Sequence, residues 1–406
     1  MKIIHLSDLH IGKRVNEFSM IEDQRYILKQ IYQIIDEEKP DAVLLAGDIY
    51  DRAVPSEEAV QLCDNMLTAL SQMNTRICII SGNHDSAERL SFGSRLLKKS
   101  QINIASVFNG SIETVLIPDK DKRMDMVIYM LPFIKPSAVR KYFENKEIVT
   151  YDDAIKAVIS TITLDKDKIN VLMLHQFITG FKACESEELS VGTLDQVSAE
   201  HFKEFDYVAL GHIHGPQNIK LPGDDGNIVP VRYCGTLLKY SFSEINHNKS
   251  VTVVEFLCDS EDDVVKDSST FITTGENRKY NLTVRIKERK LSPLHEMREI
   301  KGSYEELVSR KFYKDTNVED YIRVILTDEE DIPDALARLR SIYPNIMRLD
   351  YDNTRTRHKQ EISEAADVEK KTPQQLFAEL YRQQNNKEMS EEQNKLLNEL
   401  VETIWR

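Results

Sequence analysis

The sequence predicts an α/β fold in which short buried strands alternate with amphipathic helices, followed by a smaller second region. Three apolar runs carry this prediction: Lys2–Leu6, Ala42–Ala46 and Arg76–Ile80, each too short and too uniformly apolar for a surface helix. Between them, residues 22–39 and 56–73 show apolar side chains at helical spacing. This β-α-β-α-β order predicts a mainly parallel sheet with helices on both faces.

The two helices have recognisable ends. The first presents an apolar face and stops at Pro40, because proline cannot continue a helix. The second begins near Pro55, and Ser56 is expected to cap it by accepting a hydrogen bond from a backbone amide of its first turn. Both helices are therefore predicted to connect neighbouring strands of the sheet.

Further strands and helices follow in the next part of the chain. The pattern predicts strands at 111–117, 126–131, 169–174 and 205–210, and helices near 136–143 and 152–164. The charged residues 119–123 are expected at the solvated tip of a hairpin. Residues 229–234 and 251–257 are predicted to be antiparallel strands that close the domain.

Composition and charge restrict the class of protein. A chain of 406 residues is too long for one compact core, so two or three domains are expected. No apolar run approaches the roughly 20 residues that span a bilayer, and the N-terminus reads as a strand and not as a signal peptide. The five scattered cysteines argue against a zinc ribbon and favour reduced thiols in the cytoplasm. With a net charge of −14, any contact with DNA must be local or shared with a partner.

Polar side chains stand at the ends of five predicted strands. Asp48 follows Gly47, which allows the sharp turn where the second strand ends. In open α/β sheets, ligands bind outside the carboxyl ends of the strands. Asp8 and His10, like His212 and His214, are two positions apart and are expected to face the same point. The full set is Asp8, His10, Asp48, Asn83, His175, His212 and His214.

These residues suit a pair of metal ions better than one ion. Seven oxygen and nitrogen ligands are too many for one tetrahedral ion, and a single-metal site would leave three of them idle. They fit two ions about 3.5–4 Å apart that are bridged by one carboxylate, an arrangement that activates water for attack on a phosphate. Asp48 is the expected bridge because it ends the central strand. Carboxylate and imidazole ligands suit Mn, Fe or Zn.

The order of these motifs resembles that of the calcineurin-like metallophosphoesterase superfamily. The motifs are Asp-x-His, Gly-Asp-x-x-Asp-Arg, Gly-Asn-His-Asp, a single His and Gly-His-x-His. More narrowly, the chain resembles the SbcD family of bacterial nuclease subunits, and residues 235–244 are similar to that family's Gly-[Ser/Thr]-…-Ser-Phe-x-Glu segment. The resemblance implies a β-sandwich flanked by helices, a small α+β capping domain and a C-terminal helical pair.

The resemblance also implies a role for each site residue. One manganese ion would be held by Asp8, His10 and His214, the other by Asn83, His175 and His212, with Asp48 shared; Mg, Fe or Zn could take their place. His84 would contact the scissile phosphate and protonate the leaving oxygen, as an imidazole that titrates near neutrality can. Asp51 would orient His84, although some nucleases of the family carry histidine at that position, and Arg52 could brace a phosphate oxygen.

The sequence suggests four regions. Residues 1–265 form the metallophosphoesterase domain, 266–352 an α+β DNA-capping domain, 353–371 a linker and 372–406 a pair of amphipathic helices. Within the capping domain we expect strands at 280–287, 321–326 and 346–351, helices within 293–311 and a helix at 333–342. Between Arg278 and Lys314, eleven basic residues stand against five acidic ones, which is either a solvated face or a phosphate contact.

The resemblance implies a nuclease that works with a partner. That partner is SbcC, an ATPase related to SMC proteins, whose coiled coil would bind the helical pair at 372–406. The implied activities are 3′-to-5′ exonuclease action on duplex ends and endonuclease action on hairpins or blocked ends. A homodimer would form through helices of the first domain, those at 22–39 and 56–73.

Two other functions remain open on the residues alone. One is a metallophosphoesterase for a small phosphodiester or a phosphoprotein, which the motifs by themselves do not exclude. The other is a metal-stabilised scaffold without activity, against which His84 and Asp51 speak. The helical pair at 372–406 could also dock onto its own capping domain.

Overall fold

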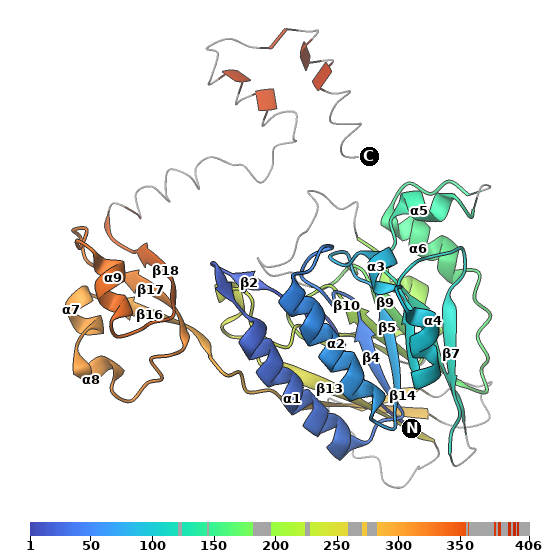
Figure 1. The fold of residues 1–406 in the computed structure, drawn as a ribbon. Helices are drawn as coiled ribbons and strands as arrows, with labels where there is room; N and C mark the ends of the chain where they lie inside the picture. Colours follow the sequence, from blue (N-terminus) through green and yellow to red (C-terminus); the bar gives the residue numbers. More distant parts are fainter. Residues whose placement is uncertain are drawn as a thin grey trace. The chain divides into compact units, whose positions relative to one another are not determined.

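The computed structural model divides the chain into two compact units (Figure 1). The first comprises Met1–Glu299 and Glu319–Arg323, and the second Ile300–Val318 and Val324–Arg406. The structure describes residues 1–120, 124–143, 146–181, 196–223, 228–258, 270–273, 282–354, 356, 377–378, 381–382, 389–390, 393–394 and 396–397. Most of the hairpin tip, of the linker and of the helical pair that the sequence suggested lies outside these residues.

A seven-stranded sheet forms one layer of the first unit, with the strand order β14-β15-β13-β1-β4-β5-β6. β1, β4, β5 and β6 are parallel, as the sequence predicted for the first three, while β13, β14 and β15 join them through antiparallel pairings. The strand bounds are β1 Lys2–Leu6, β4 Ala42–Ala46, β5 Arg76–Ile80, β6 Ile102–Ala105, β13 Ser250–Cys258, β14 Thr270–Thr273 and β15 Leu282–Lys290.

A six-stranded sheet forms the second layer, in the order β11-β12-β10-β9-β8-β7. Its four inner strands are parallel, and the two edge strands β7 and β11 are antiparallel to their neighbours. The strand bounds are β7 Glu113–Ile117, β8 Met126–Leu131, β9 Ile169–His175, β10 Tyr207–Gly211, β11 Gln217–Pro222 and β12 Ile228–Tyr233.

The two sheets pack face to face over a shared apolar core. Alternate side chains of both layers meet there, including Ile3 and Leu44 from the first sheet and Val171 and Met173 from the second. The outer face of the second sheet is covered by α5 (Pro136–Arg140) and α6 (Tyr151–Ile159). The family-based expectation of a sandwich flanked by helices is confirmed.

The remaining helices of the first unit lie outside the sandwich. Figure 1 shows α1 and α2 side by side along the first sheet. The prediction that helices cover both faces of one sheet is wrong, because the second sheet takes one of those faces. The smaller elements are β2 Arg14–Val15, β3 Phe18–Ser19, α3 Ala87–Leu90 and α4 Ser94–Leu97, and the long helices are α1 Ile21–Glu38 and α2 Glu57–Ser71.

The strands β12 and β13 were expected to be antiparallel strands that close the domain. This is confirmed for β13, which pairs antiparallel with β1 and β15. β12 lies in the other sheet, where it is antiparallel to β11 but parallel to β10. The difference comes from β11, whose alternation of half-buried and exposed residues was not recognised as a strand. β11 pairs antiparallel with β12 and so returns the chain in the direction of β10.

The second unit is a small α+β structure. A three-stranded sheet has the order β16-β17-β18, and its strands β16 and β17 begin in segments of the first unit and end in the second. The strands β17 and β18 match the predicted ranges. The range 293–311 was expected to hold one or two helices, and it contains α7 and the start of α8; the strand β16, which precedes them in the same range, was not predicted. The bounds are β16 Met297–Gly302, α7 Tyr304–Leu307, α8 Arg310–Tyr313, β17 Tyr321–Leu326, α9 Ala335–Arg340 and β18 Ile346–Tyr351.

The strand expected at 280–287 does not belong to the second unit. It is β15, which pairs with β13 along its whole length and extends the first sheet beyond residue 265. Its basic side chains meet acidic ones: Arg289 pairs with Glu37 and Glu38, and Lys287 pairs with Glu255 at 2.7 Å. Much of the local basic excess is therefore neutralised within the first unit.

Two further expectations concern membranes and cysteines. Over the residues that the structure describes, no helix combines the length and apolar character needed to cross a bilayer. The four cysteines in that part of the chain, Cys63, Cys78, Cys234 and Cys258, are free thiols.

The core between the sheets gives a stability prediction. Leu44 lies on β4, an inner strand of the first sheet, and is fully buried, so Leu44→Ala should lower the free energy of unfolding by about 2–5 kcal/mol. Leu116 on β7 is 49% exposed, and Leu116→Ala should change it by less than about 1 kcal/mol. Urea denaturation followed by circular dichroism measures both variants, and equal losses would contradict the assignment of the core.

Candidate metal centre

The strand ends that carry the predicted ligands are joined through the backbone. The Asp8 amide donates to the Gly47 carbonyl at 3.0 Å, and the His10 amide donates to the Asp48 carbonyl at 3.0 Å. Asp8, His10 and Asp48 all have positive φ, of 51°, 45° and 50°. The loops that follow the parallel strands β1 and β4 are thus hydrogen-bonded to each other. The side chains of Asp8, His10 and Asp48 lie close together beyond the ends of these strands.

Two glycines allow the side chains to approach so closely. Gly47 has a φ of 89°, and a Cβ there would lie 2.3 Å from Nδ1 of His175. At Gly82, which follows β5, a Cβ would lie 2.0 Å from Oδ1 of Asp48. Any other residue at either position would displace one of the predicted ligands.

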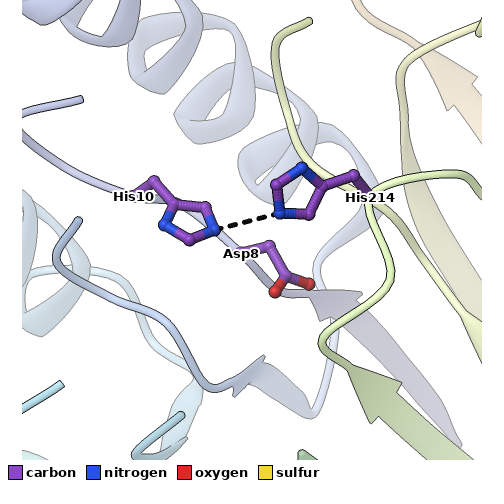
Figure 2. Close-up of side chains that lie close together, drawn as sticks. All are labelled: Asp8, His10 and His214. Atoms are coloured by element: carbon purple, nitrogen blue, oxygen red, sulfur yellow. Dashed lines mark hydrogen bonds between the residues drawn. The ribbon is translucent and has the colours of Figure 1, made fainter. Parts of the chain in front are cut away.

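One group of possible ligands consists of Asp8, His10 and His214, all buried (Figure 2). Nε2 of His10 and Nε2 of His214 face each other at 3.2 Å, above the Asp8 carboxylate. Two imidazole nitrogens in this arrangement need a proton or a cation between them. Nδ1 of His10 is buried and has no hydrogen-bond partner among the described atoms. The group therefore fits a cation.

Asp48 connects this group to a second one. Its Oδ2 lies 3.6 Å from Nε2 of His10 and 3.4 Å from Nε2 of His175. Oδ1 of Asn83 lies 3.0 Å from Nε2 of His175 and 3.1 Å from Nδ1 of His212. All seven predicted ligands are thus brought together at one end of the sandwich, with Asp48 between the two groups. His212 and His214, expected on one side, face different groups because His212 has a φ of 109°.

The electrostatics of the centre reflect the burial of many ionisable groups. Burial raises the pKa of Asp8 and lowers the pKa of His212 to about 3. Although burial opposes both shifts, the contact between Asp48 and His175 lowers the pKa of the aspartate and raises that of the histidine to about 9. The Asp48 carboxylate is therefore stabilised by positive charge at this position, where the donor set suits a metal ion.

His84 lies beside this centre and remains partly accessible. Its backbone amide donates to Oδ1 of Asp48 at 2.9 Å, and its side chain is 19% exposed. Nδ1 of His84 donates to the backbone carbonyl of Asp51 at 3.1 Å, because a carbonyl can only accept. Nε2 is therefore the free nitrogen of the neutral ring, 4.0 Å from Oδ2 of Asp48.

Asp51 contacts His84 through its backbone carbonyl. The resemblance implied that Asp51 orients His84, and the carboxylate was the group expected to make this contact. The carboxylate instead pairs with Nζ of Lys13 at 2.8 Å and lies 3.6 Å from Nδ1 of His10. Arg52 reaches Asp51 at 3.6 Å, but its side chain is 76% exposed. The Asp51 side chain therefore lies beside the ring of His10 and does not contact the ring of His84 through its carboxylate.

Gln24 and Tyr240 were not recognised from the sequence, although they hold the loop that carries His10. The Gln24 amide donates to the His10 carbonyl at 2.7 Å and accepts from the Gly12 amide at 3.0 Å. The Tyr240 hydroxyl donates to the Leu9 carbonyl at 2.7 Å. A lone Gln on an amphipathic helix gives no sequence signal for this role.

Asp85, the last residue of the Gly-Asn-His-Asp motif, also had no role predicted from the sequence. Its carboxylate accepts hydrogen bonds from the backbone amides of Ile49 at 3.1 Å, Tyr50 at 2.9 Å and Gly82 at 2.9 Å. Burial and the neighbouring charge of Asp48 raise the pKa of Asp85 to about 6. Asp85 therefore joins the loop after β4 to the loop after β5.

Removing this carboxylate should loosen the centre. Asp85→Ala leaves three partly buried amides without their acceptor, so the free energy of unfolding should fall by about 2–4 kcal/mol. Asp64→Ala on α2 is the matched control, because Asp64 is exposed and its loss should cost less than about 0.5 kcal/mol. Chemical denaturation of the two variants makes the comparison, and similar stabilities would argue against the assigned role.

Comparison with known proteins places the chain among phosphoesterases. Residues 1–216 match the family model of the calcineurin-like phosphoesterases, and residues 293–385 match a model described as the type 5 capsule protein repressor C-terminal domain. A relative from Staphylococcus epidermidis, the SbcD subunit of the nuclease SbcCD, is 32% identical over 408 residues, which cover 100% of this chain and 99% of that protein.

Solved structures with related folds are more distant. A dimetal phosphatase from Danio rerio is 11% identical, with a TM-score of 0.38, and the match covers 72% of this chain and 99% of that one. For TT1561 of Thermus thermophilus the identity is 14%, the TM-score 0.35 and the coverage 62% and 92%. The family assignment rests on the sequence matches: the chain belongs to the calcineurin-like phosphoesterases and, among them, to the SbcD nuclease subunits.

Proposed function

We propose that the chain is a manganese-dependent DNA nuclease that hydrolyses phosphodiester bonds. The observation that carries the proposal is the convergence of seven oxygen and nitrogen side chains from five strand ends around Asp48. The relative that matches the full length of the chain is a nuclease subunit, which supports DNA as the substrate.

The residues divide between two cation positions. Asp8, His10 and His214 would hold one ion, Asn83, His175 and His212 the other, and Asp48 would contact both. Two ions held by these residues would activate a water molecule and would stabilise negative charge on the phosphate. We propose manganese as the ion at both positions; the same oxygen and nitrogen donors would also bind Mg, Fe or Zn.

His84 is proposed to move the proton. Its Nδ1–H is engaged by the Asp51 carbonyl, so a second proton must sit on Nε2, the nitrogen on the side of Asp48. From there the imidazolium would protonate the oxygen that leaves the phosphate, at the 3′ or the 5′ side of the cut. Arg52, exposed beside Asp51, is free to reach a phosphate oxygen.

We also propose which regions of the chain bind DNA and the partner, and which DNA ends the chain cleaves. We assign the first unit, Met1–Glu299 with Glu319–Arg323, to the nuclease domain, and residues 300–318 and 324–352 to DNA capping. Residues 353–371 are proposed as a linker and 372–406 as the segment that binds an SbcC-type ATPase. The proposed activities are 3′-to-5′ exonuclease action on duplex ends and endonuclease action on hairpins and blocked ends. For a homodimer we propose α1 and α2, where Tyr26 and Val60 are 39% and 47% exposed.

A small phosphodiester or a phosphoprotein is the alternative substrate class, because the centre alone would serve either. The match to a nuclease subunit along the whole chain favours DNA. An assay that offers the chain DNA, a small phosphodiester and a phosphopeptide distinguishes these substrate classes.

The test compares His84→Ala, Asp48→Ala and the wild-type chain on hairpin DNA, a chromogenic phosphodiester and a phosphopeptide. His84→Ala should keep its bound manganese and lose cleavage by about 100-fold or more, since general acid catalysis contributes on the order of 10²–10⁴. Asp48→Ala should lose both metal and cleavage. His201→Ala, which removes a histidine paired with Asp152 at 2.8 Å, should behave like the wild type.

Two results would refute the proposal. If the wild-type chain cleaves DNA equally well with and without EDTA, the metal assignment is wrong. If it cleaves the phosphopeptide but no DNA, the nuclease assignment is wrong.

Truncation tests the proposed partner. A chain ending at residue 371 should retain manganese-dependent cleavage of a small phosphodiester, because the metal centre is built from residues before 250. It should no longer co-purify with the cognate SbcC-type ATPase when the two are co-expressed. Persistent co-purification would move the partner surface to another part of the chain.

A further inference from the structure

The two groups of possible ligands differ in what supports their histidines. In one group, Nδ1 of His175 donates to the backbone carbonyl of Ala46 at 2.8 Å. In the other, Nδ1 of His214 lies 3.3 Å from Oε1 of Glu244. Ala46 offers a neutral main-chain atom, whereas Glu244 offers a charged side chain.

Glu244 is buried together with a lysine. Its side chain is 0% exposed, and its Oε2 accepts from Nζ of Lys249 at 2.6 Å, with the lysine side chain only 5% exposed. Nζ of Lys249 also donates to the backbone carbonyl of His214 at 2.9 Å. The pair thus contacts His214 at both its ring and its main chain.

A buried carboxylate is costly unless it is paired and hydrogen-bonded. Oε2 of Glu244 lies 2.6 Å from the ammonium of Lys249, and Oε1 lies 3.3 Å from Nδ1 of His214. A carboxylate paired with an ammonium group accepts hydrogen bonds, so Glu244 selects the ring form of His214 that carries its proton on Nδ1. Nε2 of His214 then presents its lone pair toward His10, where Figure 2 shows the two rings facing each other.

We propose that Glu244 and Lys249 form a buried positioning pair that fixes the tautomer and direction of His214 and thereby sets the metal affinity of the Asp8–His10–His214 group. This inference rests on the proposed function, because it requires that this group bind a cation. A carboxylate behind a histidine ligand also raises the basicity of the ring, and loss of such a partner typically costs about 10–100-fold in metal affinity. The His175 side of the centre, supported by a carbonyl, should be unaffected.

The experiment measures manganese binding to the full chain by equilibrium dialysis and by the electron paramagnetic resonance signal of the free ion. The wild type should bind two ions. Glu244→Gln should bind one ion with wild-type affinity and the other about 10–100-fold more weakly. Cleavage by this variant should recover at high manganese concentration, which His84→Ala should not do. Glu200→Gln, in an exposed pair with Lys203, is the matched control and should bind like the wild type.

Lys249→Met alone leaves a buried charge uncompensated and is expected to unfold easily. The double variant Glu244→Gln/Lys249→Met removes both charges, so its melting temperature in EDTA should recover toward that of the wild type while one affinity stays low. This result separates positioning of His214 from a merely structural role of the pair.

The outcomes distinguish this inference from the proposed function. If the wild type binds no manganese, the proposed function fails and the inference with it. If the wild type binds two ions but Glu244→Gln binds both with unchanged affinity, or loses both equally, the positioning pair is refuted while the nuclease assignment stands.

Discussion

The burial of many ionisable side chains at one end of the β-sandwich is the constraint on which the rest of this structure depends. Each buried charge must be met by an opposite charge or by hydrogen bonds, because the interior solvates it poorly. Asp48 meets His175, Asp85 meets three backbone amides and Glu244 meets Lys249. The facing imidazoles of His10 and His214 complete the set, and positive ions are what such an arrangement accommodates best.

The backbone is shaped to serve this cluster. Asp8, His10 and Asp48 adopt left-handed conformations that are uncommon outside glycine, although aspartate and histidine tolerate them better than most residues. Such conformations persist only where the surroundings hold them in place. Here the parallel pairing of β1 with β4 supplies that support, since it continues as hydrogen bonds between the two loops. The sheets therefore do more than carry the loops, because their register also fixes where the carboxylates lie.

The sequence predicted what depends on local patterns. β1, β4, β5 and β8 were placed at their observed bounds because short apolar runs are bounded by polar residues. The ligand set was readable because its members stand at strand ends. The second sheet could not be predicted from the residues alone, since the repeat of strands and helices does not show which element covers a face. The supports of the centre were also missed: Gln24, Asp85 and Lys249 act through contacts between segments far apart in the chain. Asp85 stands in the Gly-Asn-His-Asp motif, but the motif does not show which backbone amides its carboxylate accepts from, and nothing in the local sequence marks Gln24 or Lys249.

The contact between His84 and the main chain of Asp51 has an implication for how this position can vary. A backbone carbonyl is present whatever side chain is attached, so the orientation of the imidazole is independent of the chemical nature of residue 51. The Asp51 carboxylate is therefore not needed to orient His84, and in this chain it pairs with Lys13 beside His10. Residue 51 thus makes two separable contacts. Its backbone carbonyl orients His84 and would do so with any side chain at this position, whereas the contact with Lys13 depends on the carboxylate and would change with a substitution.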